Sequence, residues 1–163
     1  MFNQVFRTKL ARLINETFTD GEYLMSSDRS SSLSGTSGSI INFIKEWNSL
    51  VIPYLTTMYK ANFLKLMKSI VKFISSSLES KIWSLDKNCN ELGAAKLERD
   101  VSAIISEITK FDYSLRNEFI RVTQIIMMLG LDDDEEDDDL SDMEWALTPA
   151  ERNRARNLRI DRK

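Results

Sequence analysis

The residues best suited to chemistry in this sequence are carboxylates, and they are concentrated in one stretch. Asp132 to Glu144 contains ten carboxylates and no basic residue, and eight of the ten are consecutive. A calcium site needs carboxylates at interrupted spacing and a glycine that lets the chain turn, as in an EF-hand loop. The stretch has neither, so we expect no metal site there. Because adjacent like charges repel, the pattern predicts a disordered loop over residues 132–142.

Catalysis by the other usual groups is disfavoured by what the sequence lacks. Histidine is absent and Cys89 is the single cysteine. The commonest general acid or base and the commonest metal ligand are therefore missing, and a zinc site made of thiolates is excluded. No pair of ionisable residues forms an evident catalytic constellation. We predict a non-catalytic protein without a cofactor or metal, and the lone thiol fits a reducing compartment such as the cytosol.

The charge is distributed very unevenly along the chain. The formal net charge is −3, but the chain without residues 132–144 has 15 acids against 22 bases, a net charge of +7. A basic body with one acidic loop indicates electrostatic partners or charge balancing within the chain. The arginine-rich end, residues 152–162, could suggest nucleic acid. The sequence has no recognised nucleic-acid motif and carries its own polyanion next to that end, so we expect no nucleic-acid binding.

Helices must position these residues, because the chain has only two prolines and five glycines among 163 residues. Apolar residues recur at helical spacing in four stretches, and Pro53 is expected to kink or end the second of them. Gly130 stands where a left-handed helix cap belongs. The predicted helices cover residues 2–18, 40 to Pro53, 62–85 and 94–129, the last with a bend at residues 111–113. Residues 26–39 are rich in serine and predict a flexible linker.

Two basic helical surfaces leave alternatives open. The helix over residues 2–18 could be a mitochondrial transit peptide or a membrane-surface helix, but we favour a bundle helix with a solvated basic edge. Lys65, Lys68 and Lys72 share one helix face that could meet acidic lipid or an acidic partner, and a solvated face is the favoured interpretation. The alternative function that these surfaces support is a basic amphipathic helical protein that binds anionic membrane surfaces.

The last ordered element begins with a strong start signal. Thr148 is a helix N-cap, Pro149 occupies the first helical position, and Glu151 completes a capping box. The helix that follows is rich in arginine. Order is expected to return at Trp145, just before this signal.

The C-terminal part of the sequence resembles a known family. Trp145 to Glu151 (WALTPAE), followed by Leu158 to Asp161 (LRID), is similar to the closing motif of subunit four of the conserved oligomeric Golgi complex. Asp112 to Arg121 resembles an amphipathic segment that precedes that motif in the family. The resemblance covers about residues 92–161, while residues 1–91 fit by helical pattern. The serine linker and the acidic run look like insertions in loops.

This resemblance implies a fold and a function. The expected fold is all-α, an elongated stack of helical bundles, with a helical bundle over residues 1–110 and a small C-terminal helical domain over 111–163. The implied function is that of a non-catalytic subunit of a Golgi vesicle-tethering complex in intra-Golgi retrograde transport. The implied partners are other subunits, SNAREs, their Sec1/Munc18 regulator and Rab GTPases, at the cytosolic face of Golgi membranes as a peripheral protein. Since a full subunit is far longer, Met1 is not expected to be a natural start.

The resemblance also indicates residues with a structural or interaction role. Arg121 and Glu151 lie in the two motifs, and we expect them to form a salt bridge that holds the last helix on the bundle. The alternative is that Glu151 only completes the capping box while Arg121 is solvated. The last helix must fold back to bury Trp145 and Leu147. The complete set of expected site residues is Arg121, Trp145, Thr148, Pro149, Glu151, Arg159 and Asp161.

Overall fold

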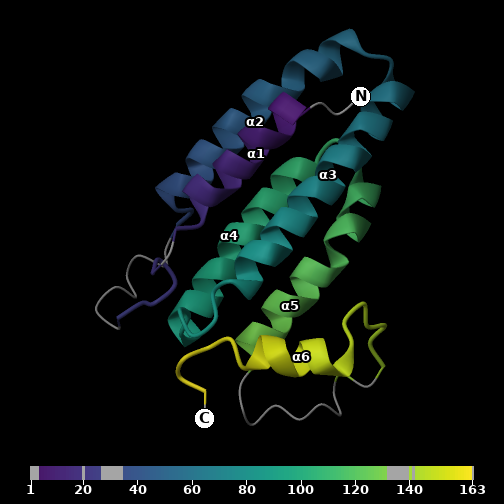
Figure 1. Ribbon diagram of the computed structural model, residues 1–163. Coiled ribbons are helices and arrows are strands. Elements are labelled where there is room, and N and C mark those ends of the chain that lie inside the picture. The colour runs from purple at the N-terminus through teal and green to yellow at the C-terminus, as the bar shows by residue number, and fades with distance from the viewer. Residues whose placement is uncertain (1–3, 20, 27–34, 132–139, 141, 163) are drawn as a thin grey trace.

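The computed structural model describes residues 4–19, 21–26, 35–131, 140 and 142–162, and helices are the regular elements within these ranges (Figure 1). The all-α prediction is therefore confirmed. The predicted serine linker and acidic loop fall largely on residues 27–34, 132–139 and 141, which lie outside the described ranges. The elements are α1 (Gln4–Thr17), α2 (Gly38–Thr57), α3 (Lys60–Trp83), α4 (Glu91–Thr109), the 3-10 helix η2 (Tyr113–Phe119), α5 (Ile120–Gly130) and α6 (Pro149–Arg156).

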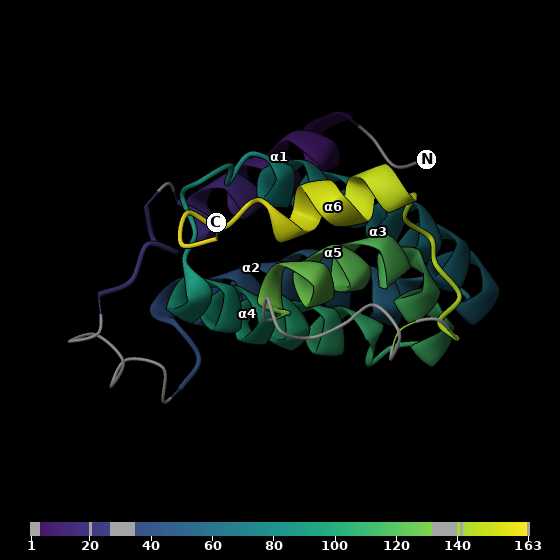
Figure 2. The same cartoon turned by 90° about the horizontal axis from the view of Figure 1, so that it is seen from below.

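The first five helices form a bundle, and α6 closes one end of it. The axes of α1, α2, α3 and α4 run side by side, while α6 lies across the lower end of α5 (Figures 1 and 2). One continuous hydrophobic cluster includes buried residues from both sides of residue 110, among them Trp47, Phe43 and Phe119. The division into segments 1–110 and 111–163 stays a prediction. No helix in the described part of the chain is long and apolar enough to cross a bilayer.

The N-terminal helix α1 is a bundle helix. Leu10, Leu13 and Ile14 are buried, and α1 packs against both α2 and α3. Its apolar stripe is thus used inside the protein, as the favoured interpretation of residues 2–18 requires. A membrane-surface helix would need the same stripe for lipid.

The helix predicted over residues 94–129 is wrong as one continuous element. α4 ends at Thr109, and the chain passes through η2 before α5 begins at Ile120. Asp112 has an extended backbone, and its Oδ1 accepts a hydrogen bond of 2.8 Å from the backbone N of Ser114. An aspartate that binds a nearby backbone amide competes with the helical hydrogen bond and starts a new element. The expected bend at residues 111–113 is therefore a full break.

Two further details differ from the sequence expectation. Pro53 lies inside α2, which continues to Thr57, so the proline does not end the helix. Ser49, whose carbonyl loses its helical partner, is exposed, so water can satisfy that carbonyl. Gly130 has no left-handed backbone and is the last residue of α5. The chain leaves that helix extended at Leu131, so no left-handed cap is needed.

Buried polar contacts fix residues 21–26 on α4. The Nζ of Lys96 lies 2.7 Å from Glu22 Oε1 and 2.7 Å from Asp100 Oδ2, and the Asp100 side chain is buried. The segment passes so close to α4 that a Cβ atom on Gly93 would lie 1.7 Å from the carbonyl oxygen of Tyr23. A glycine is therefore required at that helical position.

Candidate interaction site

Arg121, the second residue of α5, joins three separate parts of the chain. Its Nε and Nη2 donate to the carboxylate of Glu79 on α3, with a shortest distance of 2.7 Å. Its Nη2 also donates to Glu151 Oε1 on α6 at 2.6 Å, and its Nη1 donates to the carbonyl of Ala146 at 2.8 Å. We name this group the Arg121 clasp: Glu79, Arg121, Ala146 and Glu151. The salt bridge expected between Arg121 and Glu151 is present.

Glu151 also completes the cap of α6. Its Oε2 accepts hydrogen bonds from the backbone N of Thr148 at 2.8 Å and from Thr148 Oγ1 at 2.9 Å. The backbone N of Glu151 donates to Thr148 Oγ1 at 3.2 Å, and Pro149 occupies the first helical turn. The capping box and the ion pair therefore coexist, because each uses a different oxygen of one carboxylate.

The segment before α6 is fixed by the next turn of α5. The side-chain amide of Gln124 donates to the carbonyl of Glu144 at 2.9 Å, and its oxygen accepts from the backbone N of Ala146 at 2.8 Å. Leu147 is buried, and half-buried Trp145 carries the guanidinium of Arg152 at 4.5 Å from its ring centroid. The segment over residues 144–147 is thus held by both polar and apolar contacts.

The remaining two expected site residues lie beyond the other end of α6. Arg159 is buried, and its Nε donates to Asp161 Oδ1 at 2.9 Å. Asp161 Oδ2 accepts from the backbone N of Glu91 at 2.9 Å, and the backbone N of Ile160 donates to the carbonyl of Cys89 at 2.8 Å. The motif Leu158 to Asp161 therefore pairs with the turn between α3 and α4, apart from the Arg121 clasp.

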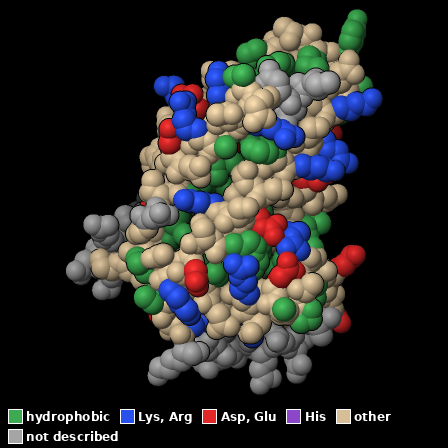
Figure 3. Space-filling model, in the orientation of Figure 1, with side chains coloured by type: hydrophobic (Ala, Val, Ile, Leu, Met, Phe, Trp, Pro, Cys, Tyr) green, Lys and Arg blue, Asp and Glu red, His purple; other side chains and the backbone are tan. Residues whose placement is uncertain are grey.

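The charges of the site lower the pKa values of its carboxyl groups. The hydrogen bond from Arg121, followed by those from Thr148, lowers the pKa of Glu151 to about 2. The pKa of Glu79 is also lowered, chiefly by its hydrogen bond from Arg121, and the pKa of Asp161 by its hydrogen bond from Arg159. Acidic and basic side chains lie next to one another where α3, α5 and α6 meet (Figure 3). All three carboxylates therefore stay ionised at neutral pH.

The site fastens segments together and has no feature of a catalytic centre. Its charged groups contact one another, and no group of three or more His, Cys, Asp or Glu side chains in the described ranges is placed to hold a metal. Sequence reasoning missed Glu79, Gln124 and the Ala146 carbonyl. Glu79 carries a usable signal, because it is the one acidic residue in α3. A solitary carboxylate on a basic helix is a natural partner for an arginine elsewhere in the chain.

An all-helical bundle with a paired, non-catalytic site defines a helical interaction module. The model of the family "Conserved oligomeric Golgi complex subunit 4, C-terminal" matches residues 1–154, so the chain belongs to this family. The match includes residues 1–91, for which the sequence offered only a helical pattern. It thereby extends the resemblance to the whole bundle.

Two curated relatives carry the same description. The chain is 38% identical to conserved oligomeric Golgi complex subunit 4 of Saccharomyces cerevisiae over 131 residues, which are 76% of this chain and 15% of the relative. It is 32% identical to the Arabidopsis thaliana protein of that name over 115 residues, which are 67% of this chain and 15% of the relative. The matched region thus spans about 15% of the length of each relative.

Proposed function

We propose that the chain acts as a non-catalytic part of a Golgi vesicle-tethering complex, through protein–protein contacts in intra-Golgi retrograde transport. The family match over residues 1–154 supports membership of the Golgi complex. The Arg121 clasp is the observation that carries the mode of action, because its charged groups hold α6 and do no chemistry. The proposed setting is the cytosolic face of Golgi membranes, as a peripheral protein.

The clasp presents a surface suited to protein contacts. Arg152 lies over the ring of Trp145 at 4.5 Å, and Arg154 lies over the ring of Trp83 at 4.4 Å from the centroid. Tryptophan and arginine are the residues most enriched at the energetic centres of protein interfaces. We assign this surface of α6 and its two tryptophans to contact with other subunits of the complex. SNAREs, their Sec1/Munc18 regulator and Rab GTPases are further proposed partners.

Affinity purification tests this proposal. The tagged full chain is recovered from cytosol, and the bound proteins are identified by mass spectrometry. We expect other subunits of the Golgi complex, with reduced recovery for Arg121→Ala at equal amounts of folded protein. Arg12→Ala is the matched control, because that arginine lies on α1 with a side chain 73% exposed. Recovery of no Golgi-complex subunit above background would overturn the proposal.

The alternative of binding to an anionic membrane surface has less support, because the apolar stripe of α1 is buried in the bundle. Sedimentation with anionic liposomes at increasing salt separates the two functions. Strong, salt-sensitive sedimentation without recovery of any subunit would favour the membrane function.

A further inference from the structure

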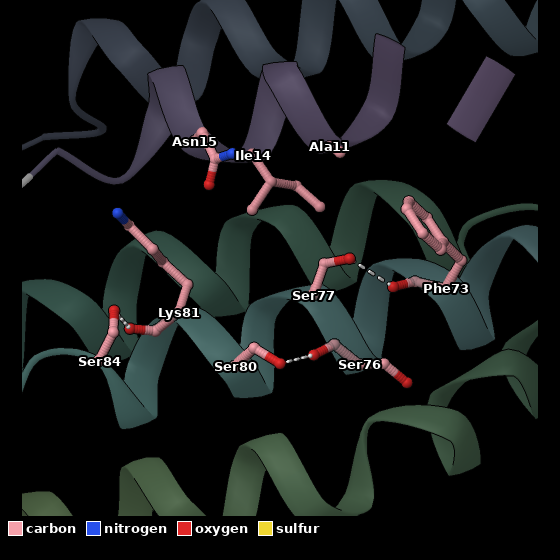
Figure 4. Close-up of a pocket in the computed structure, with 9 residues that line it drawn as sticks. All are labelled: Ala11, Ile14, Asn15, Phe73, Ser76, Ser77, Ser80, Lys81 and Ser84. Carbon is pink, nitrogen blue, oxygen red and sulfur yellow. Dashed lines mark hydrogen bonds between the residues drawn. The ribbon is translucent and has the colours of Figure 1, made fainter. Parts of the chain in front are cut away.

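A hollow lies between α1 and α3, on a side of the bundle that no other described helix covers (Figures 1 and 4). Its volume is about 490 Å³. α1 contributes mostly small or polar side chains, and α3 contributes a row of serines that faces them. The side chains that define its two walls are Ala11, Ile14 and Asn15 on α1 and Ser76, Ser77 and Ser80 on α3.

The hydroxyl groups of the α3 wall already donate their protons to the helix itself. Ser77 Oγ donates to the Phe73 carbonyl at 2.9 Å, Ser80 Oγ to the Ser76 carbonyl at 2.9 Å, and Ser84 Oγ to the Lys81 carbonyl at 2.6 Å (Figure 4). The wall is therefore wettable but offers few donors of its own. Small side chains also let another helix approach closely, since the distance between packed helices depends on the side chains at the contact.

The charges around the hollow have one sign. Lys81 lines it, and the guanidinium of Arg7 lies 5.6 Å from the ring centroid of Phe73, which also lines it. Lys72 is exposed one helical turn before Ser76, and Lys65 is exposed two turns further along the same face. No Asp or Glu in the described part of the chain lines the hollow. This surface complements a negatively charged partner.

We propose that the groove between α1 and α3 binds an acidic amphipathic helix of a partner protein, with carboxylates directed to Lys72 and Lys81. From Phe73 to Ser84 the α3 wall runs about 16 Å, which is the length of about three helical turns. A third helix laid in that groove would bury Ile14 and Phe73 more completely and would match the positive rim. A planar membrane surface cannot reach the floor of a concave groove.

This inference goes beyond the proposed function, which uses the surface of α6. A photoreactive benzoylphenylalanine in place of Ser80 in the full chain captures any occupant of the groove in cytosol. The control carries the same residue in place of Ser102, which is also an exposed serine on a helix, α4. Mass spectrometry identifies the captured segment, and its synthetic peptide is then titrated against the purified chain.

We expect the segment captured at Ser80, and not at Ser102, to be an acidic amphipathic helix. The double variant Lys72→Glu with Lys81→Glu is expected to weaken peptide binding about tenfold, because attraction is replaced by repulsion at two positions. Changing two carboxylates of the peptide to lysine is expected to restore most of the loss. This reciprocal rescue requires direct contact and is not produced by a general loss of folding.

Each contrary outcome overturns the inference. These are no product at Ser80 above the Ser102 control, a captured segment without excess acid, capture of a second copy of the chain, and charge reversal without effect. Protection of Ser80 by vesicles containing phosphatidylserine would assign the groove to membrane instead. The proposed function fails separately, since it depends on co-purification of Golgi-complex subunits and on Arg121.

Discussion

Arg121 and Glu151 are 30 residues apart, yet Arg121 Nη2 and Glu151 Oε1 lie 2.6 Å from each other, while Glu151 Oε2 accepts from Thr148. One carboxylate thus both starts α6 and fixes that helix to α5. The cap orients the carboxylate for the arginine, and the arginine holds the carboxylate for the cap. Loss of either partner is therefore expected to weaken the other contact.

Replacement of Arg121 by alanine is expected to lower the free energy of unfolding by about 2 kcal/mol, since it removes charge-assisted hydrogen bonds to Glu79 and Glu151. This is less than the ~3–5 kcal/mol of a buried pair, because the Arg121 side chain is 37% exposed. A double-mutant cycle with Glu79→Gln, measured by urea unfolding, reports the coupling. Additive effects would show that the two residues do not stabilise each other.

Replacement of Thr148 by alanine is expected to cost about 1 kcal/mol, because the first turn of α6 loses its side-chain acceptor. Thr148→Ser keeps the hydroxyl and is expected to retain most of that stability. Thermal unfolding of both variants provides the measurement. Equal destabilisation by serine and alanine would mean that the methyl group, and not the cap, matters at this position.

The clasp is expected to weaken in acid. The pKa of Glu151 falls from its ordinary 4.5 to about 2 in the folded protein, so the unfolded chain binds its proton first as pH decreases. The contribution of Glu151 is therefore complete above its unfolded pKa and is lost as pH falls from about 4.5 to about 2. Glu79 shifts in the same direction.

Urea unfolding at a series of acidic pH values measures this effect. Glu151→Gln cannot titrate at that position, so its stability is expected to depend less steeply on pH over the same window. An identical pH dependence in the variant and the native chain would show that Glu151 does not contribute through its charge.

Replacement of Gly93 by alanine is expected to destabilise the protein by about 1–3 kcal/mol or more, as overpacking usually does. The new Cβ would lie 1.7 Å from the Tyr23 carbonyl oxygen, so backbone must move. Gly130→Ala is the matched control, because that glycine is also helical and a Cβ there has nothing within 4 Å. Urea unfolding is expected to find the control unchanged or slightly stabilised. Similar values for both variants would contradict the close approach.

Local signals in the sequence are sufficient for most helices and for the start of α6. Apolar periodicity locates α1 and α3 within a few residues, and the Thr148 to Glu151 pattern predicts the capping box. Such features depend on residues close in sequence. The break between α4 and α5 is understated by the same signals, because apolar spacing resumes after Asp112 and conceals the change in backbone.

Contacts between distant residues are harder to predict. The resemblance points to Arg121 and Glu151, but nothing local indicates that Glu79 shares the same guanidinium or that Gln124 holds Ala146. Burial of Asp100 beside Lys96 is likewise beyond helical periodicity, since both are charged and would be assigned to solvent. These pairings follow from how the helices pack, which the period of one helix does not specify.

The thiol of Cys89 gives a chemical clock for the closing segment. It is fully buried beneath the pairing of its own carbonyl with Ile160, and burial raises the thiol pKa to about 12. A reagent that reacts with thiolate can modify it only during moments when that pairing opens. The rate of modification therefore counts the openings of the C-terminal segment, and no engineered label is needed to follow them.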